Sequence, residues 1–262
     1  MSRIATTFSS LKASGKKAYI GYVMAGFPSE AESLELGRRL LAAGADLLEI
    51  GVPFSDPIAD GVVIQQAADL ALKAGGSLAM AGRVLQQLRA ESQAPLLFMS
   101  YLNPLIAHGY AEFSRDAAAW GADGVIVPDM TPEESAGIKK SLGTQGLDLI
   151  FLAAPTSTPE RLKKIAKAAG GFIYVVSVAG VTGERNTFDA RLDKTVAELR
   201  RHSGLPLAIG FGVSSPESAR EAASKADGVV VASTVLKILM DGQDMNAAID
   251  KASSLISAAH GA

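Results

Sequence analysis

The feature that most constrains the fold of this chain is an alternation of short apolar segments with amphipathic ones, repeated along the whole sequence. Each apolar segment leads into a loop rich in Gly, Pro or Asp and then into a segment with helical periodicity. Three apolar segments are entered through similar sequences ending in Asp, at residues 43–46, 120–123 and 225–227. Such junctions are typical of a helix that ends and a buried strand that begins.

Eight such units are found along the chain. The predicted strands are residues 18–24, 47–51, 95–100, 124–127, 147–152, 172–176, 207–210 and 228–232. The predicted helices are residues 30–43, 64–73 with 79–90, 111–120, 133–142, 160–169, 190–201, 216–224 and 245–259.

Eight strand–helix units with short connections predict a single α/β domain, residues 1–262, folded as a (β/α)8 TIM barrel. We expect an extra N-terminal helix, residues 2–13, at the bottom of the barrel and a short helix, residues 233–240, after the last strand. A doubly wound open sheet is the alternative fold.

Composition excludes several classes of partner. The net charge is −2, the pI is about 6.0 and no basic run is present, which argues against nucleic acid and anionic membranes. No cysteine is present, which rules out disulfides and thiolate chemistry and fits a reducing compartment. No segment approaches the roughly 20 apolar residues of a membrane span, and residues 1–17 lack an apolar signal core. We therefore expect a cytoplasmic protein.

Glu49 is the one charged residue in the predicted strand 47–51, and Asp56 and Asp60 follow in the next loop. Because side chains alternate along a strand, Glu49 shares one face with Gly51. An ionised carboxylate is too costly to keep unpaired in an apolar setting, so Glu49 must be paired, face a pocket, or be protonated with a raised pKa. For Asp56, a functional role and a purely structural role as a turn-capping acid are equally consistent with the sequence.

Other polar residues stand near the carboxyl ends of the predicted strands, where barrels place their sites. Tyr22 and Tyr174 do so in strands one and six, while Tyr101 and Asp129 stand just past strands three and four. Packing in the core is the alternative for each tyrosine. Asp129 is expected either to support Glu49 or to cap the helix that follows it.

The loops that follow the last three predicted strands are residues 180–183, 210–217 and 232–234, and the first two of them contain glycines. Glycine lets backbone amides approach a ligand, and helix N-termini favour anions. Barrel enzymes often bind phosphate with the loops after strands seven and eight and a short extra helix. One such loop alone would be an ordinary turn, but three neighbouring loops together predict a phosphate site.

Several chemistries are disfavoured. His108, His202 and His260 do not converge on a metal, so no metal site is expected. No lysine ends a predicted strand, which disfavours a Schiff-base aldolase, and neither a Walker loop nor a nucleophile elbow is present. The chemistry that remains possible is acid–base catalysis by carboxylates on a small phosphorylated substrate.

The segment Glu-Ile-Gly-Val-Pro-Phe-Ser-Asp-Pro-Ile-Ala-Asp-Gly, residues 49–61, resembles the signature of tryptophan synthase alpha chains. The resemblance covers nearly the whole chain. Further blocks similar to that family follow in the same order at residues 24–28, 101–104, 127–129, 180–183 and 210–217.

The resemblance implies retro-aldol cleavage of indole-3-glycerol phosphate to indole and glyceraldehyde 3-phosphate. In that reading Glu49 shuttles protons to the indole ring carbon and from the glycerol hydroxyl, while Asp60 holds the indole N–H. Glu49 should have the higher pKa, and Asp60 should stay ionised. The remaining implied substrate-binding residues are Tyr22, Tyr101, Asp129, Tyr174, Thr182, Gly183, Phe211, Gly212, Ala232 and Ser233.

The resemblance also implies a partner, the tryptophan synthase beta chain, in an alpha-beta-beta-alpha heterotetramer. Pyridoxal phosphate is expected in that beta chain, and no cofactor in this one. Asp56 and Pro57 are expected to face the partner, and residues 180–189 to form a lid that positions Asp60 through Thr182.

This sequence departs from the family pattern at three positions: Tyr22 stands where Phe is usual, Met24 where Thr is usual, and Ala232 where Gly is usual. No departure removes an acid. A regulatory subunit with little chemistry of its own, or another phosphate-binding barrel lyase or isomerase acting alone, are the alternative functions.

Overall fold

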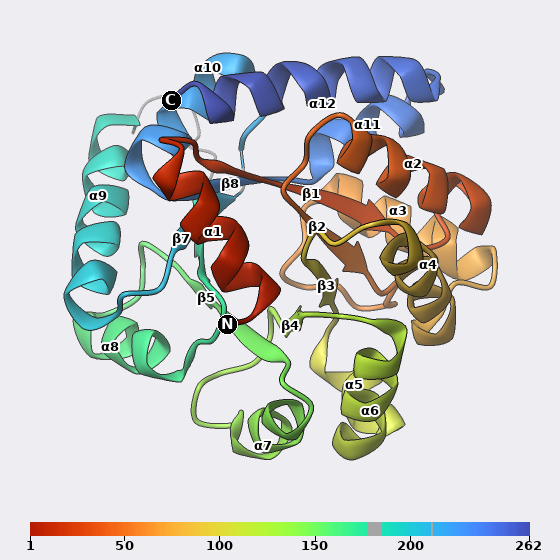
Figure 1. Cartoon of the computed structure of the whole chain (residues 1–262), viewed down its shortest axis with the longest axis horizontal. Coiled ribbons are helices and arrows are strands. Elements are labelled where there is room, and N and C mark those ends of the chain that lie inside the picture. The colour runs from red at the N-terminus through yellow and green to blue at the C-terminus, as the bar shows by residue number, and fades with distance from the viewer. Residues whose placement is uncertain (178–184, 211) are drawn as a thin grey trace.

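The structure is a computed structural model that describes residues 1–177, 185–210 and 212–262, with residues 185–189 described by their backbone alone. Its strands form a closed parallel barrel in sequence order, because β1 pairs with both β2 and β8 (Figure 1). This closure confirms the TIM barrel and rules out the open sheet. The strands are β1 (Ala18–Met24), β2 (Leu47–Gly51), β3 (Leu96–Met99), β4 (Gly124–Ile126), β5 (Asp148–Ala153), β6 (Ile173–Val176), β7 (Leu207–Gly210) and β8 (Gly228–Val231).

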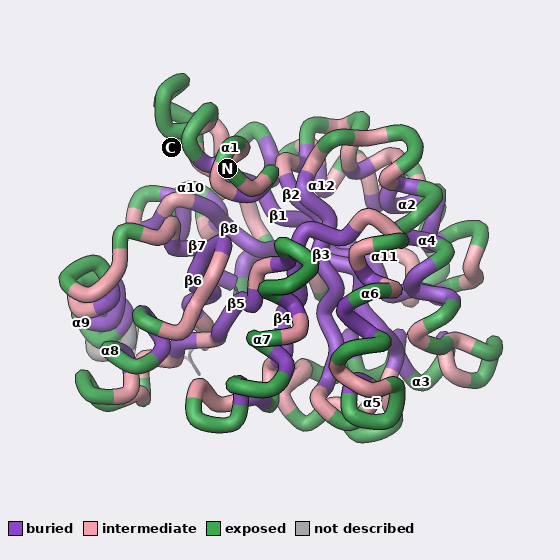
Figure 2. Tube along the Cα trace, turned by 60° about the horizontal axis from the view of Figure 1, so that its bottom comes forward, coloured by how far each residue is buried: buried purple, intermediate pink, exposed green. Residues whose placement is uncertain are grey.

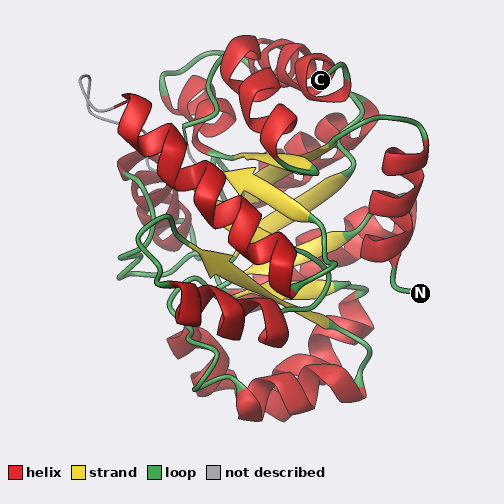
Figure 3. Ribbon diagram, turned by 90° about the vertical axis from the view of Figure 1, so that its left-hand side faces the viewer, coloured by secondary structure: helices red, strands yellow, loops and turns green. Residues whose placement is uncertain are grey.

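Helices surround the barrel (Figure 3). In the part of the chain that the structure describes they are α1 (Arg3–Ala13), α2 (Glu30–Ala42), α3 (Val62–Lys73), α4 (Leu78–Glu91), α5 (Leu102–His108), α6 (Tyr110–Trp120), α7 (Ala136–Thr144), α8 (Pro159–Ala168), α9 (Arg185–His202), α10 (Pro216–Lys225), α11 (Ser233–Met240) and α12 (Met245–His260).

The predicted elements are all present, with three differences in the helices. α5 lies where the sequence predicts no helix, and it can form because proline is tolerated in a first helical turn, where Pro104 stands. α7 begins later than predicted, because the Glu134 carboxylate accepts hydrogen bonds from the Thr131 backbone N–H (3.3 Å) and hydroxyl (2.6 Å) in a preceding turn. α9 begins at Arg185 rather than at residue 190.

α1 lies across the amino end of the barrel, as predicted (Figure 1). The Ser2 hydroxyl caps the helix by accepting from Ala5 N–H at 3.3 Å. The Phe8 ring stands 5.8 Å from the ring of Phe172, just before β6. Burial of this ring closes the bottom of the barrel, which leaves the carboxyl ends of the strands as the open face.

The strands are buried almost throughout, as the purple core in Figure 2 shows. Helices cover the outer face of the parallel sheet, so both faces of each strand are apolar, which explains the continuous apolar runs in the sequence. The repeated Asp before a strand has a shared role, because each accepts a backbone N–H from a neighbouring strand and thereby fixes its start. These pairs are Asp46 with Tyr19 (2.8 Å), Asp123 with Leu96 (2.8 Å) and Asp227 with Leu207 (2.9 Å).

Candidate active site

One cavity lies at the carboxyl ends of the strands and collects six of the residues that the sequence predicts. It is lined by Glu49, Asp60, Ile64, Met99, Tyr174, Gly212, Val213, Val230, Ala232 and Ser233. The apolar members Ile64, Met99, Val213 and Val230 were not predicted. In sequence, an apolar residue that faces a cavity has the same pattern as one that faces the core, so no signal distinguished them.

Glu49 lies in the middle of β2 and points into the barrel. Its neighbours in register are Tyr22 on β1 and Leu97 on β3. The residue is 1% exposed, and its Oε1 has no hydrogen-bond partner in the described structure. Burial, together with the nearby charge of Asp60, raises the pKa of Glu49 to about 8. Of the three outcomes expected for this acid, its burial beside a cavity without a hydrogen-bond partner for Oε1 favours a protonated carboxyl with a raised pKa.

Asp60 reaches the same cavity from the loop between β2 and α3. Partial burial raises the pKa of Asp60 to about 6, and hydrogen bonding from Tyr101 opposes the increase. Its Oδ1 has no partner among the described residues. Two acids in one cavity therefore have different proton affinities, and the order agrees with the one expected from the sequence.

Tyr101 holds this loop in place and does not line the cavity. Its hydroxyl accepts a hydrogen bond from Ala59 N–H at 3.0 Å, and its ring stacks on Phe54 with centroids 5.3 Å apart. Both contacts lie within the segment that carries Asp60. Tyr101 therefore fixes the position of Asp60 and is also a neighbour that tunes its charge.

Tyr22 and Tyr174 are both buried inside the barrel. Tyr174 lines the cavity. Tyr22 does not, and its hydroxyl lies 3.9 Å from the sulfur of Met24. The pKa values of both phenols are raised well above their ordinary range, first by burial and then by the charges of Glu49 and Asp60. These shifts place both rings in the electrostatic surroundings of the two acids.

The loops after β7 and β8 also contribute to the lining of the cavity. Gly212 has φ of +79°, a conformation that favours glycine. α11 begins at Ser233, and its cap Ala232 offers no side-chain acceptor to the first-turn amides. A helix N-terminus with free amides attracts an anion. This arrangement supports the phosphate site that the glycine loops predict.

Two predicted acids, Asp129 and Asp56, lie outside the cavity, as Tyr22 and Tyr101 do. Asp129 is exposed and accepts a hydrogen bond from Leu102 N–H at 3.0 Å, so it caps α5 rather than the helix that follows it. Asp56 is exposed and accepts from the Ser55 hydroxyl. Thr182, Gly183 and Phe211 lie outside the described residues.

The described residues contain neither a metal site nor a membrane-spanning helix. No group of three or more His, Asp or Glu side chains there is arranged to hold a metal ion. No helix there has the length and apolar character needed to cross a membrane.

The fold and the cavity define an α/β-barrel enzyme with two carboxyl groups set for acid–base chemistry beside an anion-binding helix terminus. The family model for the tryptophan synthase alpha chain matches residues 8–260. The chain belongs to this family.

Individual relatives agree with that membership. The tryptophan synthase alpha chain of Geobacter sulfurreducens is 44% identical over 91% of this chain and 90% of its own length. That of Gluconobacter oxydans is 47% identical over 91% of this chain and 89% of its own. Among solved structures, the alpha subunit from Legionella pneumophila superposes with a TM-score of 0.89 at 34% identity, covering 98% of each chain. Ligand-free tryptophan synthase from M. tuberculosis gives 0.91 at 31% identity, covering 99% of each chain.

Proposed function

We propose that Glu49 and Asp60 carry out the reaction of tryptophan synthase alpha chains, the retro-aldol cleavage of indole-3-glycerol phosphate to indole and glyceraldehyde 3-phosphate. The observation that carries this proposal is that Glu49 and Asp60 line one cavity, each with a buried carboxyl oxygen that has no partner among the described residues, while burial raises the pKa of Glu49 to about 8 and that of Asp60 to about 6. Near neutral pH Glu49 holds a proton and Asp60 is charged. One cavity therefore offers both a proton donor and an anion.

The proton balance of the cleavage fits this pair of acids. Protonated Glu49 donates to the indole ring carbon that carries the glycerol chain, and the positive charge that develops is stabilised by Asp60 at the indole N–H. The resulting Glu49 carboxylate then takes the proton of the adjacent glycerol hydroxyl. The carbon–carbon bond breaks, its electrons return to the ring, and the former alcohol carbon becomes the aldehyde. Glu49 ends protonated again.

The remaining residues bind the substrate in this proposal. The Gly212 loop and the first turn of α11, with Ala232 and Ser233, receive the phosphate. Tyr174 hydrogen-bonds near the glycerol. The residues assigned by family resemblance alone are Tyr22 and Phe211 in the indole wall, and Thr182 and Gly183 in the lid and phosphate site. Tyr101 acts by holding the loop that carries Asp60.

We further propose that the tryptophan synthase beta chain binds at the rim of this cavity. Ile58 is 82% exposed and Val62 is 67% exposed, and both lie beside Asp56 around the loop that carries Asp60. Large apolar side chains exposed together favour a protein partner. The partner would bring pyridoxal phosphate, this chain would need no cofactor, and the assembly would be an alpha-beta-beta-alpha heterotetramer in the cytoplasm. The alpha unit is one domain, residues 1–262.

Indole release by the full chain, with and without beta chain, tests the catalytic assignment. Glu49→Gln should lose activity by about 10²–10⁴-fold, the usual contribution of a general acid–base group. Glu35→Gln, which removes an exposed carboxyl on α2, is the matched control and should retain full activity. Full activity of Glu49→Gln would disprove the mechanism. Absence of indole release by wild type under all conditions would instead favour a regulatory subunit.

A further inference from the structure

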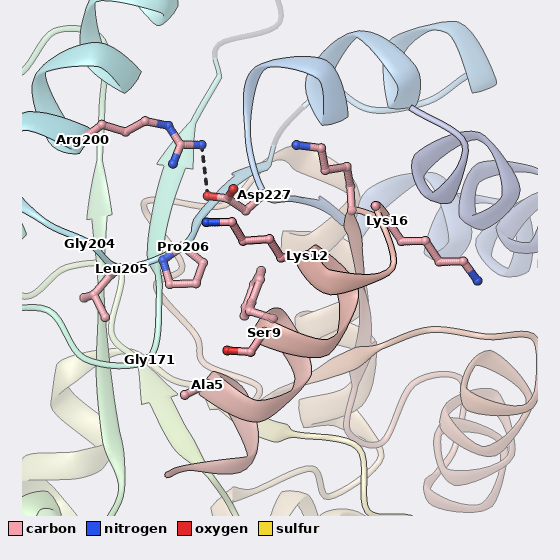
Figure 4. Close-up of a pocket in the computed structure, with 13 residues that line it drawn as sticks. Ala5, Ser9, Lys12, Lys16, Gly171, Arg200, Gly204, Leu205, Pro206 and Asp227 are labelled. Atoms are coloured by element: carbon pink, nitrogen blue, oxygen red, sulfur yellow. Dashed lines mark hydrogen bonds and ion pairs between the residues drawn. The ribbon is translucent and has the colours of Figure 1, made fainter.

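A second cavity, of about 400 Å³, lies at the opposite end of the barrel from Glu49. Its lining includes residues that immediately precede three strands, Lys17 before β1, Pro206 before β7 and Asp227 before β8. α1 forms one wall, and the segment between α9 and β7 forms another (Figure 4). The proposed catalysis uses none of these residues. Amino-end faces of barrels usually serve stability.

The charges around this cavity are unbalanced. Four cationic residues line it, Lys12, Lys16, Lys17 and Arg200, against the single acid Asp227. Asp227 is already engaged, because its Oδ2 pairs with Arg200 Nη2 at 3.1 Å and accepts from a backbone N–H of β7 at 2.9 Å. The cavity therefore retains an excess of positive charge after its internal pairing.

Lys12 is the cation best placed to bind a ligand. It lies in the last turn of α1, and Figure 4 shows its side chain extending toward the Arg200–Asp227 pair. Among the described residues it has no hydrogen-bond or ion-pair partner. Lys17, by contrast, donates from Nζ to the Ala226 carbonyl at 2.9 Å. Gathering like charges at one opening costs electrostatic energy that a bound anion would offset.

The floor of the cavity is apolar. Phe8, Ala5, Leu205 and Pro206 contribute to it, and Phe8 is buried to 5% exposure. An inorganic anion would leave this surface unused. The combination of apolar walls with a few charged groups is typical of sites for small organic ligands, and about 400 Å³ lies within the usual range of roughly 300–1,000 Å³.

We propose that the cavity between α1 and the α9–β7 connection binds a small organic anion, with a carboxylate or phosphate held by Lys12 and Arg200 and an apolar body against Phe8 and Leu205. The site lies away from both the acids and the surface proposed for the beta chain. Its occupant bridges α1 and the segment after α9, and therefore stabilises the closure of the barrel bottom.

Amide NMR of the isotopically labelled full chain tests this proposal, because it reports binding at each end of the barrel separately. The probes are benzoate, phenyl phosphate, inorganic phosphate and neutral benzyl alcohol, at constant ionic strength. Benzoate or phenyl phosphate should shift the amides of Gly15, Gly204 and Leu205 saturably, and whichever binds more tightly identifies the headgroup. Shifts at Gly212 and Ser233 would instead report the site at the mouth.

Variants at Lys12 give the matched comparison. Lys12→Gln should weaken the effect at Gly204 and Leu205 about tenfold, because one charge-assisted contact is lost, and Lys12→Glu should abolish it. Lys140→Gln, which removes an exposed lysine on α7, should change nothing. Indole release should be unaffected in all three. Unchanged binding by Lys12→Glu would overturn the proposal.

The neutral and inorganic probes separate the two halves of the assignment. Benzyl alcohol binding as tightly as benzoate would rule out recognition of charge. Inorganic phosphate binding as tightly as phenyl phosphate would rule out recognition of the apolar body. Absence of saturable shifts at the barrel bottom with every probe would overturn the site altogether.

Discussion

The hydroxyl of Tyr22 occupies the space that a β-carbon on Gly51 of the adjacent strand would fill. Tyr22 is in register with Glu49, so its ring reaches along β2 toward the carboxyl end of the barrel. Tyr174 stands over Gly210 in the same way. In both pairs the glycine gives the tyrosine the room it needs to carry its hydroxyl toward the acids. Gly51 is thus required by a side chain on the neighbouring strand.

Gly51→Ala should therefore destabilise the protein by about 1–3 kcal/mol, the usual cost of overpacking a core. Tyr22→Phe in the same chain should recover only part of this loss, because the terminal ring carbon also crowds the site. Urea unfolding of the four forms gives the coupling energy. Gly143→Ala is the control, since nothing lies within 4 Å of its added methyl group on α7. An equally small effect of both alanines would contradict the packing argument.

Glu49→Gln should make the protein more stable than wild type at alkaline pH, although it lowers catalytic activity by about 10²–10⁴-fold. The folded pKa of Glu49, about 8, lies above its ordinary value of 4.5, so the folded state holds a proton that the unfolded chain releases. The stability from this protonated carboxyl is fully present below about pH 4.5 and is lost as pH rises through about 8.

The loss is on the order of 5 kcal/mol, and glutamine avoids it because it stays neutral. Urea unfolding of wild type and Glu49→Gln between pH 5 and pH 9 measures the difference in their free energies of unfolding. This pH range covers most of the interval between the ordinary and the folded pKa of Glu49. The two curves should diverge with rising pH. Parallel curves would show that Glu49 titrates normally in the folded protein.

The pH profile of kcat/KM for indole release should be bell-shaped. Activity falls above about pH 8 as Glu49 loses the proton that it must donate, and below about pH 6 as Asp60 becomes neutral. Steady-state rates across this range, with the unfolded fraction checked at each pH, provide the test. A single limb at acid pH, with full activity at high pH, would show that Glu49 begins the cycle as a base.

Tyr101→Phe should move the acidic limb of that profile to higher pH. Hydrogen bonding from Tyr101 lowers the pKa of Asp60, so its removal lets burial raise that pKa further. Loss of the contact with Ala59 N–H also loosens the loop, which reduces kcat more than it changes KM. Tyr110→Phe, at the start of α6, is the control and should leave the limb in place. If the acidic limb of the kcat/KM profile did not move in Tyr101→Phe, the Tyr101 side chain would contribute only packing to the site.

Strands and acids were predictable from the sequence for specific physical reasons. A buried parallel strand is apolar on both faces, so a charge such as Glu49 within one stands out, and the Asp residues before the strands mark their starts. Met99 and Val230 could not be recognised as cavity residues in this way, because apolar side chains are used both where a strand faces a cavity and where it faces the core. The second role of Tyr101 depends on a contact with Ala59 across 42 positions, which spacing along the chain does not reveal.

Ile58→Asp should weaken binding of the beta chain while leaving the barrel intact. The side chain is 82% exposed, so its replacement costs little folding energy, but a charge in the apolar centre of an interface must be desolvated on binding. Leu70→Asp is the matched control, since Leu70 is also apolar and exposed but lies about 12 Å further along α3 than Val62. Titration of beta chain against each variant, followed by calorimetry, gives the affinities.

Indole release by the free chain should be the same in wild type and both variants, because neither side chain lines the cavity. Equal affinity of Ile58→Asp and wild type for the beta chain would move the partner surface elsewhere, whereas equal weakening by both variants would extend it along α3.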